Sequence, residues 1–397
     1  MYKDILALLD NSDYSLWGLD RAIEIANQFG STIYGTHSYA ARLHEERFIQ
    51  MEPGLPARYQ VPDEMMRQRQ IHGELIEKGL GIISDSYLDV FQARCDEKGV
   101  PNKRRVMEGK NYSSLVKEIE ANSYELVTLG IRGQGEVKSS QVGSVCERVT
   151  RRINTDILIA KNAKSLKGGH IVVGIDGSPQ SYAAMQTAID FSKRFDCKVT
   201  ALAVFDPEFH YRVFHNITKV LSEEAGKVFR FKEQEKLHEE IIDSGLEKIY
   251  RDHLNCAMEM ATRQGLTNGN SVKSEVLPGK PFDAILNWLS GKDIALLLLG
   301  KVGVHYDDGL DIGSNSEFLY RNAPCNVLLV NRKAKPEPVE EKRPEVEWTA
   351  EALEMLNRVP GFVRNLVRGH MEANAHKEGK TKITLEMMLE ARKKMGM

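Results

Sequence analysis

The sequence lacks closely spaced cysteines, a long apolar run and an excess of charge of either sign. Its five cysteines are at least 51 residues apart, which excludes a CxxC metal pair, disfavours a disulfide framework and is typical of a cytoplasmic protein. The longest aliphatic run, Ile294–Leu299, has six residues, whereas a membrane-spanning helix needs about 20. Lys and Arg number 54 against 56 Asp and Glu, so neither nucleic acid nor a membrane is expected as a partner.

What the sequence does contain is one internal repeat. The length of 397 residues suggests two to three domains at about 150 residues each. Four landmarks of the first half recur in the same order in the second half, displaced by 166 residues for the first and by 170 for the others. They are Asp10-x-Ser12 and Asp176-x-Ser178, Gly109-Lys110 and Gly279-Lys280, Gly130-x2-Gly133 and Gly300-x2-Gly303, and Gly143-Ser144 and Gly313-Ser314. We interpret this pattern as a tandem duplication.

Within each copy, short apolar runs alternate with segments of helical periodicity. In the second copy, Ser178 is predicted as a helix N-cap and Pro179 as the first helical residue. Such alternation predicts an α/β fold with a parallel sheet covered on both faces. The predicted strands are 5–9, 31–38, 104–107, 126–129 and 157–160 in the first copy, and 171–175, 198–205, 274–277, 295–299 and 327–330 in the second.

The predicted domain boundaries follow from this repeat and from a change in composition after Arg332. Two α/β domains are expected at 1–163 and 168–332, each with a long helical insertion, at about 39–100 and 207–265. Residues 333–345 carry three prolines among charged residues, which is typical of a semi-extended linker. Residues 346–397 are predicted to form a small all-α domain that buries little surface by itself.

The motif G-x2-G-x9-G-S occurs once in each copy, between a predicted strand and a predicted helix. Glycines at the end of a strand allow backbone to approach a ligand closely. The Gly-Ser pair opens the helix, where free N–H groups and the positive end of the helix dipole suit a phosphate. Asp10 and Asp176 end the first strand of each copy, where they can accept hydrogen bonds from ribose hydroxyls.

The aspartate, the glycine after the third strand and the glycine motif together resemble the universal stress protein family, over about residues 1–332. The resemblance implies two tandem five-stranded, Rossmann-like domains of the ATP-binding branch, with adenine nucleotide held by ribose, phosphate and adenine contacts. The residues it implies are Asp10, Ser38 (backbone), Gly130, Gly133, Gly143, Ser144 and Val145 in copy one, and Asp176, Val204, Gly300, Gly303, Gly313, Ser314 and Asn315 in copy two. It also implies that the last strands, 157–160 and 327–330, pair with each other to make an internal pseudo-dimer.

The two glycine loops differ in charge, with a net +1 in loop one and −2 in loop two. The charged residues are Arg132, Glu136 and Lys138 in loop one, and Lys301, Asp307, Asp308 and Asp311 in loop two. We therefore include Arg132 among the phosphate-binding residues. Acids beside a triphosphate repel it, which favours weaker binding at site two. The alternative is that Asp307, Asp308 and Asp311 hold a magnesium ion that bridges to the phosphates.

No catalytic constellation is evident in either copy. The sequence offers no HExxH motif and no Ser–His–Asp or Cys–His arrangement within the repeat. His37 is interpreted as a packing residue at the rim of the adenine pocket, and Cys146 as a buried, inert thiol. The protein is therefore not expected to be an enzyme, although slow ATP hydrolysis remains an alternative.

The last 50 residues have a resemblance of their own. Trp348, Pro360, Phe362 and the Ile383-Thr384 pair are arranged as in the small domain that ends the B subunit of light-independent protochlorophyllide reductase. This implies a module that docks onto a protein partner, with the helical insertions as further contact surfaces.

Two functions follow as hypotheses: a nucleotide-binding regulator, or a nucleotide-independent accessory subunit of a redox or tetrapyrrole-related complex. Whether the chain forms a homodimer is left open.

Overall fold

The computed structural model divides the chain into two compact units, Met1–Pro336 and Glu337–Met397. The residues it describes are 1–135, 140–208, 212, 216–217, 233, 236, 245–266, 271–307, 309, 311–336, 346–357, 359, 364, 367–368, 371–372, 374–375 and 380–394. Most of the predicted linker, 333–345, therefore lies outside the described residues.

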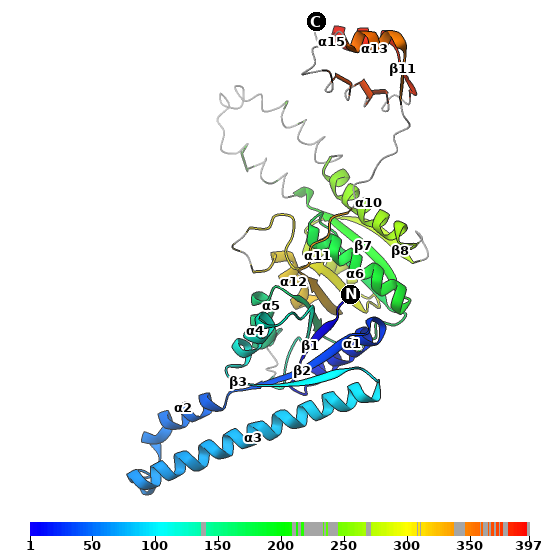
Figure 1. Cartoon of the computed structure of the whole chain (residues 1–397). Helices are drawn as coiled ribbons and strands as arrows, with labels where there is room; N and C mark the ends of the chain where they lie inside the picture. Colours follow the sequence, from blue (N-terminus) through cyan, green and yellow to red (C-terminus); the bar gives the residue numbers. More distant parts are fainter. Residues whose placement is uncertain are drawn as a thin grey trace. The chain divides into compact units, whose positions relative to one another are not determined.

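A ten-stranded sheet forms the centre of the first unit (Figure 1). Its first half has the order β3-β2-β1-β4-β5 and its second half continues β10-β9-β6-β7-β8. All pairings within each half are parallel, which confirms the predicted α/β class. The strands are β1 (Asp4–Leu8), β2 (Thr32–Tyr39), β3 (Asn102–Glu108), β4 (Leu126–Gly130), β5 (Asp156–Ala160), β6 (His170–Gly174), β7 (Lys198–Phe205), β8 (Val272–Pro278), β9 (Leu296–Gly300) and β10 (Asn326–Val330).

The two halves join where β5 and β10 pair antiparallel. Val327 lies opposite Ile159, and Leu328 lies opposite Leu158. The predicted pairing of the last two strands is thus correct, and it takes place within one chain. The two repeats share a single continuous sheet because each covers the edge that the other would expose.

Helices cover both faces of the sheet, as the alternation of strands and helices predicts. Each face carries one apolar core that runs across both repeats. The helices of the first face are α1 (Asp13–Phe29), α6 (Pro179–Phe195) and α10 (Glu247–Arg263), and those of the second are α4 (Asn111–Ala121), α5 (Ser144–Arg152), α11 (Pro281–Leu289) and α12 (Ser314–Asn322). The predicted cap is present, since the Ser178 side chain accepts from Ser181 N and Pro179 is the first residue of α6.

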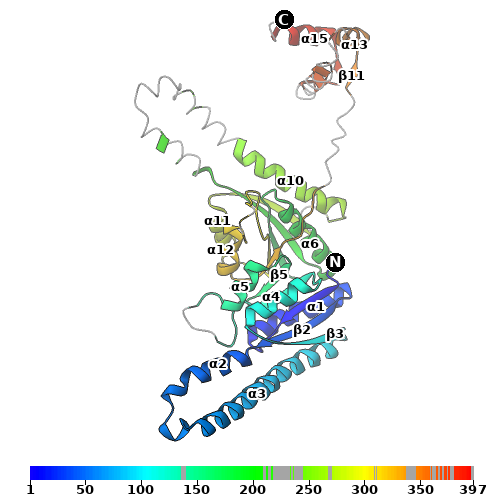
Figure 2. The ribbon, with the colours of Figure 1, turned by 60° about the vertical axis from the view of Figure 1, so that its left-hand side comes forward.

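The first insertion is a helical hairpin. It comprises α2 (Ala41–Met51), two short 3-10 turns (Glu52–Gly54 and Ala57–Tyr59) and α3 (Pro62–Glu97). The last part of α3 packs on the sheet through Ser84, Leu88, Phe91 and Cys95, which are buried. A Cβ at Gly35 in β2 would lie 2.5 Å from the Phe91 ring, so that glycine lets α3 approach the strand. The rest of the hairpin extends away from the sheet (Figures 1 and 2).

The second insertion, predicted to be helical over 207–265, contains α10. Most of the segment before α10 lies outside the described residues. Nowhere in the described part of the chain is there a helix that is both long and apolar enough to cross a membrane.

The C-terminal unit contains the helices α13 (Ala350–Asn357) and α15 (Leu385–Lys394). The Thr349 hydroxyl accepts from Ala352 N at 3.3 Å, as expected for an N-cap. The all-α prediction missed one feature, a parallel pair of two-residue strands, β11 (Glu347–Trp348) and β12 (Lys382–Ile383). Strands this short carry no alternation of apolar and polar residues from which a sequence could reveal them.

Candidate functional site

Two cavities lie at the carboxyl ends of the parallel strands, one in each repeat. The first has a volume of about 580 Å³ and the second about 290 Å³. The first is lined by all eight residues predicted for copy one: Asp10, Ser38, Gly130, Arg132, Gly133, Gly143, Ser144 and Val145. The second is lined by all seven predicted for copy two: Asp176, Val204, Gly300, Gly303, Gly313, Ser314 and Asn315. The fold therefore gathers each predicted set around one space.

Asp10 ties the glycine loop to the start of α1. Its Oδ1 accepts from Ser12 N at 3.1 Å and from Ser12 Oγ at 2.6 Å, and its Oδ2 accepts from Gln134 N at 3.0 Å. Asp176 makes the same three contacts in the second repeat, to Ser178 and Val304. A carboxylate has about four acceptor positions, so Asp10 can still accept a hydrogen bond from a ribose hydroxyl. The sequence did not reveal that Asp10 and Asp176 also hold the glycine loops in place.

The first two glycines of each motif are required by neighbouring protein atoms. A Cβ at Gly130 would lie 2.6 Å from Tyr14 Cβ and 2.8 Å from Ser15 N, where α1 crosses the end of β4. A Cβ at Gly133 would overlap the Asp10 carboxylate. These glycines thus allow close packing of helix, strand and loop, a requirement separate from any approach of backbone to a ligand.

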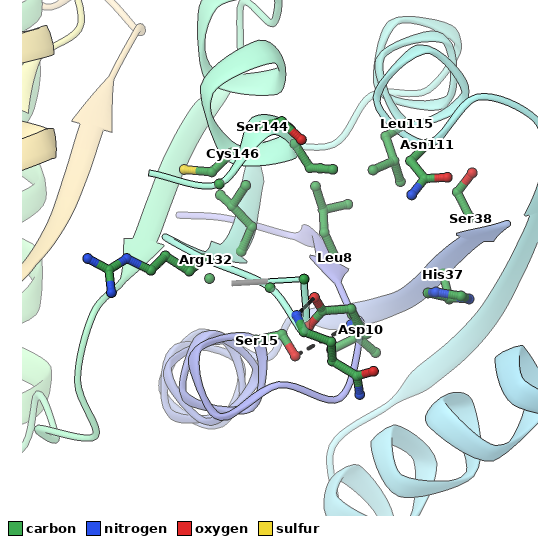
Figure 3. Close-up of a pocket in the computed structure, with 18 of the residues that line it drawn as sticks. Leu8, Asp10, Ser15, His37, Ser38, Asn111, Leu115, Arg132, Ser144 and Cys146 are labelled. Atoms are coloured by element: carbon green, nitrogen blue, oxygen red, sulfur yellow. Dashed lines mark hydrogen bonds between the residues drawn. The ribbon is translucent and has the colours of Figure 1, made fainter. Parts of the chain in front are cut away.

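The start of α5 faces the first cavity, as Figure 3 shows. Gly143 N donates to Ile131 O at 2.8 Å, which holds the loop closed, and the helix begins at Ser144. The N-cap Gly143 makes no side-chain cap hydrogen bond. The first-turn N–H groups, which have no intrahelical acceptor, therefore lie at the cavity with the positive end of the helix dipole.

The opposite end of the first cavity contains the Ser38 hydroxyl, beside Asn111 and Leu115 (Figure 3). Ser38 is 5% exposed, and its Oγ has no hydrogen-bond partner among the described residues. A buried hydroxyl without a partner costs free energy. The atom itself has less than 1 Å² of accessible surface, so a rotation about the Ser38 χ1 bond is needed before it can meet a polar group of a ligand.

His37, also in the first cavity, is held in place by α3. Its Nδ1 lies 2.8 Å from Ser84 Oγ, and its ring packs edge-on against Tyr87 at 5.0 Å. Burial lowers the pKa of His37 below its usual value, which keeps the ring neutral at pH 7. Tyr87 Oη donates to Gln134 Oε1 at 3.1 Å. The insertion thus forms one wall of the cavity, and the interpretation of His37 as a packing residue agrees with these contacts.

The sequence profile described as the universal stress protein family matches residues 1–161 and 169–331. The chain belongs to the universal stress protein family. A second profile, described as the proto-chlorophyllide reductase 57 kD subunit, matches residues 348–392.

The chain is also similar to individual proteins. A universal stress protein of Methanocaldococcus jannaschii is 26% identical over 166 residues, which are 41% of this chain and 85% of that protein. A functionally unknown protein of Pseudomonas aeruginosa has a solved structure that covers 83% of this chain and 92% of its own, with a TM-score of 0.52 and 13% identity. A universal stress protein solved in complex with cAMP covers 40% of this chain and 97% of its own, with a TM-score of 0.27 and 21% identity.

The two universal stress protein repeats differ in the polar groups around their cavities. Ser38 and Arg132 of the first repeat correspond to Val204 and Val302 of the second. Glu136 and Lys138 of loop one and Asp308 of loop two lie outside the described residues. Among the residues that are described, no three His, Cys, Asp or Glu side chains are grouped to hold a metal ion.

Lys301 does not line the second cavity, although its position in the sequence places it among the charged residues of loop two. Its side chain is buried, and Nζ donates to Ile153 O at 2.5 Å and to Arg151 O at 3.3 Å in the first repeat. Burial lowers the pKa of Lys301 to about 8. The positive charge of Lys301 is therefore directed away from the second cavity. Asp307 and Asp311 do not line that cavity either, and Asp311 lies 4.0 Å from Arg151 of the first repeat.

The helices that open at the two cavities are joined by reciprocal ion pairs. Arg321 of α12 pairs with Glu147 of α5 at 2.7 Å, and Arg151 of α5 pairs with Glu317 of α12. These four residues are related by the 170-residue offset of the repeat, so the contact is a pseudo-twofold one. Cys146, between them, is buried, which raises the pKa of its thiol to about 12 and agrees with an inert thiol.

Proposed function

We propose that this tandem universal stress protein binds an adenine nucleotide, ATP, in the first cavity and acts as a non-catalytic regulator. The observation that carries the proposal is that one cavity has, at its two ends, polar groups without a hydrogen-bond partner in the described part of the protein. One end is the uncapped start of α5 with Ser144, and the other is the unpartnered Ser38 hydroxyl.

The phosphate end suits an anion. Ser144 and Val145 begin α5, where backbone N–H groups and the helix dipole attract negative charge. Arg132 lines the same cavity, and the second repeat has Val302 at this position. Arg132 Nε donates to Gln141 O at 3.3 Å, and the guanidinium extends away from Ser144 (Figure 3), so its contribution to phosphate binding is a long-range positive charge. We place the phosphates here and the ribose at Asp10.

The base end suits a group with hydrogen-bonding edges. Ser38 Oγ can donate to a ring nitrogen or accept from an amino group, and Leu115 offers apolar contact. In the second repeat Val204 cannot make that hydrogen bond, and its cavity has about half the volume. We therefore propose that nucleotide occupies the first site more tightly than the second.

A regulatory role without catalytic turnover is supported by the two side chains in this cavity that could act as a general base, because both are already hydrogen-bonded to the protein. Asp10 accepts from Ser12 and Gln134, and His37 is hydrogen-bonded to Ser84. All five cysteines are free, which supports the proposal that the protein works in the reducing cytoplasm.

Calorimetric titration with ATP, with and without magnesium, tests this proposal. Losing one hydrogen bond to a phosphate costs about 1.5–3 kcal/mol, so Ser144→Ala should weaken binding roughly 10- to 150-fold. Ser38→Val, which copies the second repeat, should weaken it roughly 2- to 10-fold. Ser314→Ala is the matched control and should leave the tight site unchanged. Equal affinity of the wild-type protein and Ser144→Ala would contradict the proposal.

A second function, docking to a protein partner, is favoured by the profile match at residues 348–392. The C-terminal unit has its own small core, which includes Ala352, Leu356, Ile383 and Met388. We propose that it attaches the regulator to a redox or tetrapyrrole-related complex. Deletion of 346–397 should abolish co-purification of that complex while ATP binding persists, and unchanged co-purification would refute it.

A further inference from the structure

The outer half of the α2–α3 hairpin exposes apolar side chains in an ordered stripe. Ile71, Leu75 and Ile82 are 49%, 66% and 69% exposed. At 100° per residue they fall within about 40° of one another around α3. We call these three residues the α3 stripe. Contiguous exposed apolar residues on one helix face are typical of an interaction surface.

The hairpin itself is well built, so the stripe is not a sign of a poorly packed helix. Phe48 of α2 stacks on His72 of α3 with ring centroids 4.2 Å apart. Arg69 of α3 pairs with the buried Glu52 of the connecting turn. These contacts hold α2 on a different face of α3 and leave the stripe uncovered within the described residues.

The charges at the ends of the stripe select the kind of helix that can cover it. Arg67 lies one turn before Ile71, and Asp85 lies about one turn after Ile82, on the same side of α3. Arg67 also lies 3.7 Å from Glu64 on its own helix, in an exposed pair that competes with any partner. Lys78, at the centre, is exposed and can lay its aliphatic stem along the stripe. A second α3 running antiparallel would place Ile71 opposite Ile82 and Arg67 beside Asp85, twice by symmetry. A parallel copy would place like charges together.

The edges of β5 and β10 are already paired with each other inside the chain, and the sheet ends at β3 and β8. We propose that the α3 stripe joins two copies of this protein, with their α3 helices antiparallel about a twofold axis near Leu75 and Lys78. The two hairpins then form a four-helix bundle. This proposal does not depend on nucleotide binding.

Light scattering coupled to size-exclusion chromatography of the full chain tests the proposal. The wild-type protein should be a dimer at micromolar concentration, and Leu75→Glu with Ile82→Glu should be a monomer. Met66→Glu is the matched control, because Met66 is 64% exposed on the other side of α3, and it should remain a dimer. A monomeric wild-type protein, or a dimer that survives the double substitution, would overturn the proposal.

Charge reversal tests the antiparallel arrangement and excludes a different partner helix. Arg67→Asp alone and Asp85→Arg alone should each weaken the dimer at least several-fold, measured as the dissociation constant in analytical ultracentrifugation. The combined variant should recover wild-type affinity, because each reversed charge again meets its opposite in the second copy. Failure of the combined variant to recover would refute antiparallel self-association. All of these positions are exposed, so circular dichroism should show unchanged helix content.

Discussion

The buried carboxylate of Asp156 links the two repeats, and Asp156→Ala tests whether they unfold as one unit. Asp156 begins β5 in the first repeat and its side chain is fully buried. It accepts from Tyr2 Oη at 2.8 Å and from Arg332 Nε at 2.7 Å. It also accepts from the backbone N of Asn331 at 2.8 Å and of Arg332 at 3.2 Å, both just after β10.

The size of the effect follows from what the substitution leaves unpaired. Removing one member of a buried ion pair costs about 3–5 kcal/mol. The Arg332 side chain is 44% exposed and keeps hydrogen bonds to Tyr2 Oη and Thr187 Oγ1. The cost therefore lies at the lower end, about 3 kcal/mol.

The expected change in melting temperature depends on the size of the cooperative unit. Unfolding entropy is about 2.1 cal/mol/K per residue, so a loss of about 3 kcal/mol lowers Tm by about 4 °C if Met1–Pro336 unfolds together. If the repeats unfolded separately, the same loss would lower the Tm of one repeat by about 9 °C. The shared sheet and the cores that span both repeats favour the single transition.

Differential scanning calorimetry distinguishes these outcomes. Tyr2→Phe is the comparison variant. It removes one hydrogen bond to the charged carboxylate, worth about 1.5–3 kcal/mol, but leaves the ion pair with Arg332, so it should lower Tm less than Asp156→Ala does. Two separate transitions, of which only one shifts, would refute the continuous cooperative unit. An unchanged Tm for Asp156→Ala would refute the energetic reasoning about the buried carboxylate.

Two further predictions concern the glycine loop and the buried lysine. Gly133→Ala should displace the Asp10 carboxylate and weaken ATP binding at least tenfold in calorimetry, whereas Gly135→Ala, where a Cβ meets no atom within 4 Å, should bind as wild type. The pKa of Lys301 is lowered by burial to about 8 from 10.5, so the unfolded chain binds more protons between these pH values and stability rises with pH there. Relative to Lys301→Met, the wild-type protein should therefore gain about 1 kcal/mol in urea unfolding between pH 7 and pH 9.

The two aspartates and the glycine motifs were found by repetition and spacing, whereas Ser38, Val145, Val204 and Asn315 were implied by the family resemblance. Gly143 and Ser144 recur as Gly313 and Ser314 after predicted strands, and local rules place such pairs at a helix start. The Ser178 cap was equally local, since its contact spans three residues. Predictions of this kind depend on chemistry within one or two turns of the chain.

Other features depended on contacts between distant residues. Asp10 reaches Gln134 across 124 positions, and nothing next to either residue indicates that contact. The sequence predicts Lys301 as a positive charge of loop two, whereas its Nζ donates to backbone carbonyls of the other repeat. Tyr87 and Tyr250 each line a cavity from an insertion helix. They lie 163 positions apart, which matches neither the 166 nor the 170 of the landmarks, so the repeat gave no signal for them.

The sequence by itself determined the duplication, the α/β class and the two glycine motifs, because repeated spacing and the periodicity of strands and helices are local properties. Other cavity residues, such as Ser38 and Val204, were implied by the resemblance to the universal stress protein family. The sequence also predicted unequal sites, from the charges of the two loops, and the tertiary structure decided which groups line each cavity. Site one holds an unpartnered Ser38 hydroxyl and Arg132, whereas site two has Val204 and Val302, and its loop lysine is turned toward the other repeat. The physical reason is that the direction of a side chain depends on the elements packed against it, and those come from distant parts of the chain.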